Sequence, residues 1–326
     1  MRKFHYLGLW AVVLTTGICV SEITHAQSYP SKNIRLTIPF PPGGASDILA
    51  RAVADRLTDS LKQRVIVDNR PGGGGLIAID LVAHAPADGY SLLQIAASFV
   101  INPSLYKKLP YNAQTDFSAI SILAIADNIL VAHPSLPTRS VRDLIALAKK
   151  RPGQLNYGHS GYGTQSFLAA ELFKQMAEVD VVPIPYKGAP AALLDVIAGQ
   201  IQIIFAGAPP ALSHVRSGKL RPLAVGGKNR LPQLPGVPTL AETLPGFEAS
   251  VWYGFLAPAG TPQEIVVRLN AEVNKILQLP ATKEFLMANG FRIASPMTPE
   301  AFSAYMISEG EKWAQVLKQS GVSATN

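Results

Sequence analysis

The sequence predicts an α/β protein with two domains, and three observations support this fold class. The chain has 326 residues, which at about 150 residues per domain corresponds to two domains. Short apolar runs rich in β-branched residues alternate with amphipathic stretches, which is the pattern of βαβ units. The alternation starts again near residue 155, which predicts a second sheet. Because 48% of the residues are hydrophobic and only 16% are charged, a disordered chain is excluded.

The first part of the chain carries one complete βαβ pattern. Leu49, Val53 and Leu57 recur every four residues, so the helix that contains them is expected to bury one apolar face against the sheet. Ser46 is the predicted N-cap of this helix, because a serine side chain accepts a hydrogen bond from the first helical turn. The expected elements are strands at residues 34–38, 65–67 and 91–96 and a helix at residues 46–61.

The second part of the chain begins with a helix that has signals at both ends. Ser140 followed by Asp143 forms a capping-box-like start, and Lys149, Lys150 and Arg151 suit the negative C-terminal end of a helix. The elements expected after it are strands at residues 155–158, 181–184, 201–205 and 223–225 and helices at residues 164–177 and 190–198.

Two more helices are expected near the C-terminus. Thr261, Pro262 and Glu264 combine a capping box with a proline in the first helical turn. Pro299 opens the last predicted helix. A proline-rich loop at residues 231–245 precedes both of them.

The N-terminus has the composition of a secretory signal peptide. Arg2 and Lys3 precede an apolar run at residues 6–20, and Ala26 is a small residue suited to cleavage. We expect residues 1–26 to be removed, and a lipid anchor at Cys19 is the alternative. Because Cys19 is the only cysteine, the mature chain is expected to have no disulfide, no thiol catalysis and no thiolate metal site.

The charge distribution argues against a nucleic-acid partner. The 29 Lys and Arg residues exceed the 22 Asp and Glu residues, but the basic residues are scattered along the chain. After the N-terminal segment, no stretch has the roughly 18 consecutive apolar residues of a transmembrane helix. The sequence therefore predicts an exported globular protein that binds no nucleic acid.

Catalytic and metal-binding signatures are incomplete. The segment around Ser160 approaches the nucleophile elbow of hydrolases, but Tyr162 stands where close packing needs glycine. A secreted serine hydrolase that used Ser160 would need His159, His133 or His214 as its base. The histidines share no metal-ligand spacing, so neither a metal nor a cofactor is expected.

Two glycine-rich loops, each between a predicted strand and a predicted helix, have the chemistry of anion sites. They are Phe-Pro-Pro-Gly-Gly-Ala-Ser-Asp at residues 40–47 and Ser-Gly-Tyr-Gly-Thr at residues 160–164. Glycines let backbone N–H groups approach a ligand, and a helix N-terminus adds unpaired donors with partial positive charge. One carboxylate group per loop is the natural fit, and ordinary tight turns are the alternative.

Four other features bear on these loops. An amino-acid ligand would need Asp47 to face its ammonium group, whereas the expected role of Asp47 is helix capping. Lys187 either neutralises an anion at the same sheet edge as Ser160 or is an exposed surface lysine. We expect Asn69 and Arg70 to brace the first loop. Two aromatic residues of one predicted strand either wall a pocket or belong to the core, namely Trp252 and Tyr253.

At these residues the sequence resembles a known family, the extracytoplasmic solute receptors of the tripartite tricarboxylate transporters, or Bug family. The matching segments are residues 39–51, 68–75, 85–93, 160–172, 185–199 and 237–262. They follow in order along nearly the whole mature chain. Phe167 stands where many relatives have histidine, and Asn112 where the family often has aspartate.

The resemblance implies a periplasmic binding protein of the type II flytrap form. In that fold two lobes, each an α/β sandwich, are joined by two crossing strands, which are expected here at residues 129–132 and 252–257. The expected division is a signal peptide at residues 1–26, lobe 1 at residues 27–130 plus 251–326, and lobe 2 at residues 131–250. The chain is expected to act as a monomer.

The resemblance also implies a ligand site between the lobes, where backbone N–H groups and ordered waters bind a carboxylate-bearing organic acid. The residues expected at this site are Phe40, Pro42, Gly43, Gly44, Ser46, Asp47, Ser98, Ser160, Gly161, Gly163, Thr164, Tyr186, Lys187 and Ala206. The implied function is capture of a mono-, di- or tricarboxylate for a membrane transporter. The alternatives are a ligand-sensing adaptor for a sensor kinase and a secreted serine hydrolase.

Overall fold

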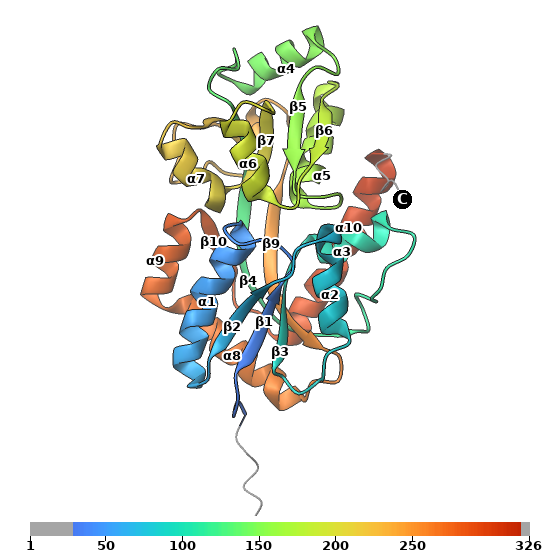
Figure 1. The fold of residues 1–326 in the computed structure, drawn as a ribbon, viewed down its shortest axis with the longest axis vertical. Coiled ribbons are helices and arrows are strands. Elements are labelled where there is room, and N and C mark those ends of the chain that lie inside the picture. The colour runs from blue at the N-terminus through green and yellow to red at the C-terminus, as the bar shows by residue number, and fades with distance from the viewer. Residues whose placement is uncertain (1–28, 321–326) are drawn as a thin grey trace, which may run out of the picture.

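The structure is a computed structural model that describes residues 29–320 of the chain. Two lobes are stacked along the long axis of the molecule (Figure 1). The N-terminal and C-terminal parts of the chain form the first lobe, and the middle of the chain forms the second lobe. The predicted signal peptide and the alternative lipid anchor lie outside the described residues.

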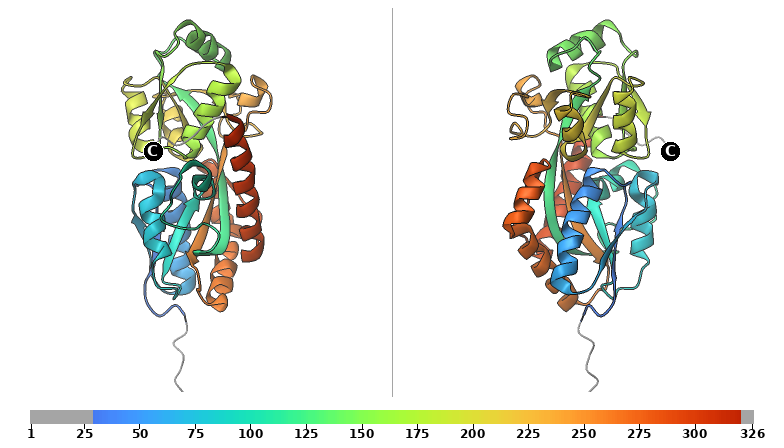
Figure 2. Two further views of the ribbon diagram at one scale, coloured as in Figure 1. Left: turned by 90° about the vertical axis from the view of Figure 1, so that its right-hand side faces the viewer. Right: turned by 60° about the vertical axis from the view of Figure 1, so that its left-hand side comes forward.

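Lobe 1 is a sheet with helices on both of its faces. Helix α2 packs on β1 and β3, whereas α8 and α10 pack on β4, and the second set of views shows these helices on opposite sides of the sheet (Figure 2). The elements of lobe 1 are β1 (Ile34–Ile38), α1 (Ala45–Leu61), β2 (Val65–Asn69), a 3-10 turn (Gly73–Gly75), α2 (Leu76–Ala83), β3 (Ser91–Ala96), α3 (Ser98–Leu105), α8 (Gln263–Gln278), α9 (Pro280–Ala288), β10 (Phe291–Ile293) and α10 (Pro299–Ser320).

Lobe 2 repeats the arrangement on a smaller scale. Helix α5 packs against β5 and β7, and α6 packs on the same two strands. The elements of lobe 2 are α4 (Val141–Lys150), β5 (Asn156–His159), α5 (Gln165–Ala177), β6 (Val182–Pro185), α6 (Ala189–Ile197), β7 (Ile203–Gly207), α7 (Ala208–Arg216), β8 (Arg221–Val225) and a 3-10 turn (Leu240–Glu242).

Two long strands, β4 (Phe117–Ala132) and β9 (Ser250–Pro258), connect the lobes (Figure 1). Strand β4 pairs with β9 as far as Asp127 and with β7 from Asn128 onward, so it belongs to the sheets of both lobes. The strand order is β2-β1-β3-β9-β4-β7-β5-β6, with β1, β2 and β3 parallel to one another and β5 parallel to β6 and β7. The predicted two-lobed α/β fold with two crossing strands is confirmed, and the proposed limits at residues 130 and 250 stay predictions.

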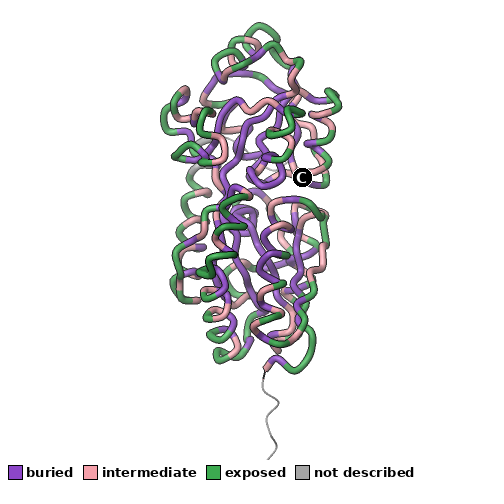
Figure 3. Tube along the Cα trace, turned by 90° about the vertical axis from the view of Figure 1, so that its left-hand side faces the viewer, coloured by how far each residue is buried: buried purple, intermediate pink, exposed green. Residues whose placement is uncertain are grey.

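Local sequence signals explain several elements. Leu49, Val53 and Leu57 are fully buried. One cluster of buried residues extends through both lobes and a second lies in lobe 2, and buried segments run along the inside of both lobes (Figure 3). Ser140 caps α4 as predicted, because its hydroxyl accepts a hydrogen bond from the N–H of Asp143 at 3.1 Å.

Two predicted helix caps are wrong. Helix α1 begins at Ala45 with Gly44 as its N-cap, and the buried hydroxyl of Ser46 instead contacts Nε2 of Gln94 at 2.7 Å. Helix α8 begins after Pro262 without a side-chain cap, since the Thr261 hydroxyl donates backward to the carbonyl of Pro258 at 2.8 Å. Both hydroxyls bind partners that lie outside the first helical turn. The spacing of residues in the sequence does not predict such partners.

Candidate ligand-binding site

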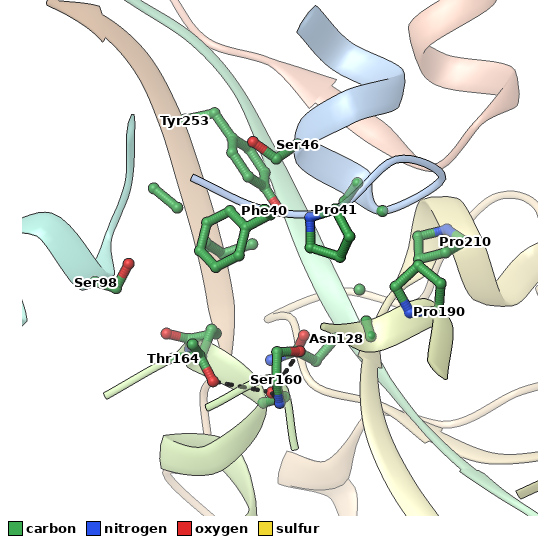
Figure 4. A pocket seen from close by; sticks show the side chains of 18 residues that line it. Phe40, Pro41, Ser46, Ser98, Asn128, Ser160, Thr164, Pro190, Pro210 and Tyr253 are labelled. Atoms are coloured by element: carbon green, nitrogen blue, oxygen red, sulfur yellow. Dashed lines mark hydrogen bonds between the residues drawn. The ribbon is translucent and has the colours of Figure 1, made fainter. Parts of the chain in front are cut away.

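A small cavity lies between the two lobes, with walls from both of them (Figure 4). Its volume is about 80 Å³. One water molecule needs about 10–15 Å³ of such space, so the cavity has room for roughly five to eight waters or a small organic molecule. The predicted site residues that line it are Phe40, Gly44, Ser46, Ser98, Ser160 and Thr164.

The N-terminal ends of five helices meet at this cavity. Each of the helices α1, α3, α5, α6 and α7 places a residue of its first turn in the wall, namely Ala45, Ser98, Gln165, Ala189 and Pro210. The first N–H groups of a helix have no partner within the helix, and the helix dipole adds partial positive charge there. An anion between the lobes therefore meets a positive potential from several directions.

No charged side chain lines the cavity in the part of the chain that the structure describes. Prolines in the first turns of α6 and α7 also remove N–H donors from those two helices. The backbone donors available to a ligand thus come mainly from α1, α3 and α5, and α1 and α5 follow the two glycine-rich loops.

The first loop, whose residues 40–44 precede α1, is held by a buried carboxylate. Asp47 accepts hydrogen bonds from the N–H of Gly43 at 3.0 Å, from Nε of Arg51 at 3.0 Å and from Nδ2 of Asn69 at 3.0 Å. Burial raises the pKa of the Asp47 carboxyl, but these hydrogen bonds outweigh burial and hold its pKa below the usual value. Asp47 is only 4% exposed and does not line the cavity. Its carboxylate therefore holds the first loop in place and does not face the ligand.

Asn69 and Arg70 differ in their relation to the first loop. Nδ2 of Asn69 also donates to the carbonyl of Phe40 at 3.0 Å, so the prediction that Asn69 braces the loop is confirmed. The side chain of Arg70 binds Asp68 at 3.0 Å instead, so the same prediction for Arg70 is wrong.

The second loop, residues 160–164 between β5 and α5, is held by neutral groups. The hydroxyl of Thr164 donates to the carbonyl of Gly161 at 2.6 Å and lies 3.1 Å from the hydroxyl of Ser166. The Ser166 hydroxyl accepts from the N–H of Ser160 at 2.9 Å and lies 3.2 Å from the hydroxyl of Ser160. Ser166 was not predicted as a site residue, although its position two residues after Thr164 in the first turn of α5 was a usable signal.

His159 supports the second loop from inside the lobe. Its Nδ1 accepts a hydrogen bond from the N–H of Gly161 at 3.2 Å. Burial lowers the pKa of His159, and nearby Glu171 acts in the opposite direction. The imidazole is therefore neutral near pH 7, as a hydrogen-bond acceptor at Nδ1 must be.

Three further polar residues of the wall were not among the predicted site residues. Asn128 lies on β4 where the strand passes between the lobes, Gln165 is the first residue of α5, and Tyr253 lies on β9. Burial raises the pKa of the Tyr253 hydroxyl, so Tyr253 faces the cavity as a neutral group. Of the two interpretations for the aromatic pair, Tyr253 walls the cavity, whereas Trp252 packs at right angles against Phe302 in lobe 1.

Eight predicted site residues do not line the cavity. Pro42 and Gly43 are exposed on the first loop, and Ala206 is fully buried inside lobe 2. The hydroxyl of Tyr186 binds Asp195 at 2.7 Å, and Lys187 is exposed on the surface. The other residues of this set are Asp47, Gly161 and Gly163. For Lys187 the structure thus agrees with a surface lysine.

The two lobes touch around the cavity through residues with little or no side chain. A methyl group at Gly188 of lobe 2 would lie 2.3 Å from Cγ of Pro41 in lobe 1. A methyl group at Gly163 would lie 2.9 Å from Oδ1 of Asn102. The structure is therefore a closed form in which glycines allow the lobes to approach.

The arrangement around Ser160 lacks the parts of a serine hydrolase. Its hydroxyl lies beside the hydroxyl of Ser166, and no histidine among residues 29–320 makes a hydrogen bond to it. His159 accepts from Gly161, and Nδ1 of His133 lies 2.6 Å from the hydroxyl of Ser135. Within the same residues, no helix is long and apolar enough to span a membrane, and no three metal-ligating side chains form a cluster.

Two α/β lobes, two crossing strands and a cavity between the lobes define the class of two-lobed solute-binding proteins. Residues 49–322 match the family described as the tripartite tricarboxylate transporter family receptor, and the chain belongs to this family. Protein BugT of Bordetella pertussis is 37% identical over 326 residues, a match that covers 98% of this chain and 99% of BugT. The predicted membership of the Bug family is confirmed.

Solved structures support the same family. Rpa4515 of R. palustris, solved with adipate, is 35% identical, with a TM-score of 0.88 over 90% of this chain and 99% of that chain. MatC of Rhodopseudomonas palustris, solved with bound malate, is 28% identical, with a TM-score of 0.84 over 89% of this chain and 100% of that chain.

Proposed function

We propose that this protein is a periplasmic receptor that captures a carboxylate-bearing organic acid between its lobes. The observation that carries the proposal is the meeting of five helix N-termini at a cavity that no charged side chain of residues 29–320 lines. Such a site attracts an anion through backbone N–H groups and dipoles, and no carboxylate of residues 29–320 lines it to attract a cation.

The size and polarity of the cavity define the ligand class further. Adipate has ten non-hydrogen atoms and malate has nine, which is the scale of a cavity with room for a few waters, and two relatives were solved with these acids. An amino acid fits less well, because Asp47 is engaged by Gly43, Arg51 and Asn69, and within the described part of the chain no carboxylate lines the cavity. A small mono- or dicarboxylate is therefore the proposed ligand.

The proposed role is delivery of this acid to the membrane subunits of a tripartite tricarboxylate-type transporter. Family membership supports the role, and the secretory character of residues 1–26 supports a periplasmic location of the mature chain. A receptor of this kind works as a monomer, since both walls of the cavity come from one chain.

Titration calorimetry of the mature chain with a panel of organic acids and amino acids tests the proposal. We expect a carboxylic acid to bind with 1:1 stoichiometry and the amino acids not to bind. Small-angle scattering with the bound acid should give a smaller radius of gyration than scattering without it, because the ligand draws the lobes together. A protein that binds no acid, or that binds one without closing, contradicts the proposed receptor.

A further inference from the structure

Two hydroxyl groups in the cavity wall have no hydrogen-bond partner in the protein. Tyr253 is 5% exposed and Ser98 is 6% exposed, and both residues line the cavity. Within residues 29–320 neither hydroxyl makes a hydrogen bond, and both oxygens are accessible from the cavity. Each side chain is thus more than nine-tenths buried and keeps an open hydroxyl where a ligand would lie.

The other hydroxyls of the wall already have partners. In lobe 2 the hydroxyl of Ser166 lies 3.1 Å from that of Thr164 and 3.2 Å from that of Ser160. In lobe 1 the hydroxyl of Ser46 accepts a hydrogen bond from Nε2 of Gln94 at 2.7 Å. These hydroxyls serve the protein, whereas the two open hydroxyls remain for the ligand.

Strand pairing places both open hydroxyls on lobe 1. Tyr253 on β9 lies opposite Ala96 on β3, and Ala96 also lines the cavity. Ser98 follows two residues later as the first residue of α3. Trp252 packs in lobe 1 on the other face of β9, since successive side chains of a strand alternate. The close view shows the Tyr253 ring extending from β9 into the group of lining residues, with Ser98 on the side of α3 (Figure 4).

The small size of the cavity means that a bound ligand replaces the water around both hydroxyls. With a volume of about 80 Å³, the cavity is filled by an acid of the size of adipate or malate. A buried hydroxyl that loses water without a new partner is costly, so the ligand must supply the partner. An ionised carboxylate only accepts hydrogen bonds, and a hydroxyl can donate one. Burial raises the pKa of the Tyr253 hydroxyl, so its proton stays available for donation.

We propose that Tyr253 binds the ligand directly, by donating a hydrogen bond from its hydroxyl to a carboxylate oxygen, and that Ser98 donates a second one from α3. This inference rests on the proposed function and adds two side-chain donors to the backbone N–H groups of the site. Both donors belong to lobe 1, so the side chains that recognise the acid are unequally divided between the lobes.

Calorimetry of the mature chain with adipate, succinate, malate, lactate and benzoate tests the inference. Tyr253→Phe and Ser98→Ala each remove one hydroxyl oxygen. Each should weaken the acids that bind the wild type by about ten- to a hundredfold, the usual effect of a hydrogen bond to a charged group. Two matched controls should bind like the wild type. Tyr305→Phe removes the same atom on the other face of β9, against Trp252, and Ser104→Ala lies at an exposed position of α3.

The possible results separate this inference from the proposed function. Wild-type affinity in either variant overturns the assignment of that hydroxyl and leaves the receptor function standing. A loss of affinity for malate without a loss for succinate overturns the assignment as well, because the lost partner would then be the hydroxyl of the acid. If the wild type binds no carboxylic acid at all, both proposals fail.

A thermal scan of the ligand-free variants separates recognition from a structural role. Neither hydroxyl bonds to the described part of the protein, so the melting temperatures of both variants should match that of the wild type. Small-angle scattering at saturating acid should show the same closure as in the wild type. A lower melting temperature of Tyr253→Phe together with unchanged affinity would assign Tyr253 to the core of lobe 1 and overturn the inference.

Discussion

The two loops that face the cavity both precede a helix N-terminus that can bind an anion, but different kinds of side chain hold the two loops in place. The first loop is fixed by an ionised carboxylate, Asp47, with Arg51 on its outer side. The second loop is fixed by the hydroxyls of Thr164 and Ser166 and by the neutral imidazole of His159. Each arrangement leaves the N-terminus of the following helix free of a charged side chain toward the ligand.

This difference shows how an anion site is stabilised without placing a charge in it. In the first loop the negative charge of Asp47 is satisfied by three donors and turned away, so it does not repel an incoming carboxylate at close range. In the second loop the groups that hold the backbone are hydroxyls and a neutral imidazole, so they carry no charge. The first loop should therefore depend on one ionised residue, whereas the second should depend on several weak bonds that are lost one at a time.

The largest effect is expected where the first loop meets lobe 2, at Gly188. Its backbone is extended, with φ of 166°, so a larger residue fits the backbone, but its Cβ would lie 2.3 Å from Cγ of Pro41. Gly188→Val should hold the lobes apart and remove the contacts of one lobe with the ligand. Loss of two charge-assisted hydrogen bonds corresponds to at least about a hundredfold weaker binding.

Calorimetry and scattering check this prediction together. Gly188→Val should keep a larger radius of gyration in the presence of ligand, with its melting temperature near that of the wild type. Gly236→Val is the matched control, because no atom lies within 4 Å of a methyl group at Gly236. Normal closure in Gly188→Val would mean that the first loop moves aside and is less rigid than its hydrogen bonds suggest.

The next effect concerns the single carboxylate of the first loop. Asp47→Asn replaces a charged acceptor of three hydrogen bonds by a neutral amide that donates with one of its atoms. Unfolding in urea should show a loss of about 2 kcal/mol, the usual size for hydrogen bonds to charged groups. Asp55→Asn, at an exposed position of the same helix, should have almost no effect. Equal stability of the two variants would remove the distinction between the loops.

A smaller effect is expected in the second loop. Thr164→Ala loses the bond to the carbonyl of Gly161 and the contact with Ser166, both of them neutral. Ligand affinity should fall about three- to tenfold, because each neutral bond contributes about 1 kcal/mol. Thr164→Ser retains the hydroxyl and should bind like the wild type. A hundredfold loss in Thr164→Ala would mean that the hydroxyl contacts the ligand directly.

Local signals in the sequence predicted the features of the fold that depend only on residues close to one another in the chain. The cap of α4 by Ser140 and the buried stripe of α1 follow from spacing alone, and so does the placement of both loops between a strand and a helix. The resemblance to the family added the two lobes and the crossing strands. Helices α2, α3, α7 and α9 and strand β10 were not predicted, since their short patterns are interrupted by glycine or proline or give no clear period.

Contacts between distant parts of the chain could not be predicted in this way. The hydroxyl of Ser46 does not cap α1 as predicted, because it accepts a hydrogen bond from Gln94 of β3. Asn128 reaches the cavity only because β4 passes from the sheet of one lobe to that of the other. The polar pair at residues 127–128 inside a long apolar run was the available signal for Asn128. Its meaning depends on strand pairing, which the sequence alone does not show.

The smallest predicted effect is a difference in the response of the two loops to mild acid. Burial lowers the pKa of His159, so below the usual histidine pKa of about 6.5 the unfolded chain binds a proton that the folded chain does not. The contribution of His159 to stability is complete above pH 6.5 and is lost as the pH falls toward its lower folded-state pKa. The pKa of Asp47 is also lowered, but its contribution is lost only below the usual aspartate pKa of about 3.9.

Between pH 7 and pH 5.5 the second loop should therefore weaken while the first does not. A protonated Nδ1 cannot accept the N–H of Gly161, so acid acts directly on the backbone of the second loop. Urea unfolding at both pH values should show a larger loss of stability in the wild type than in His159→Asn, whose Oδ1 replaces Nδ1 as an acceptor that does not titrate in this range. The difference should not exceed about 1.4 kcal/mol per pH unit, the limit for one proton. The other histidines are common to both proteins and cancel in the comparison, so identical pH dependence would mean that His159 is not the acid-sensitive brace of the second loop.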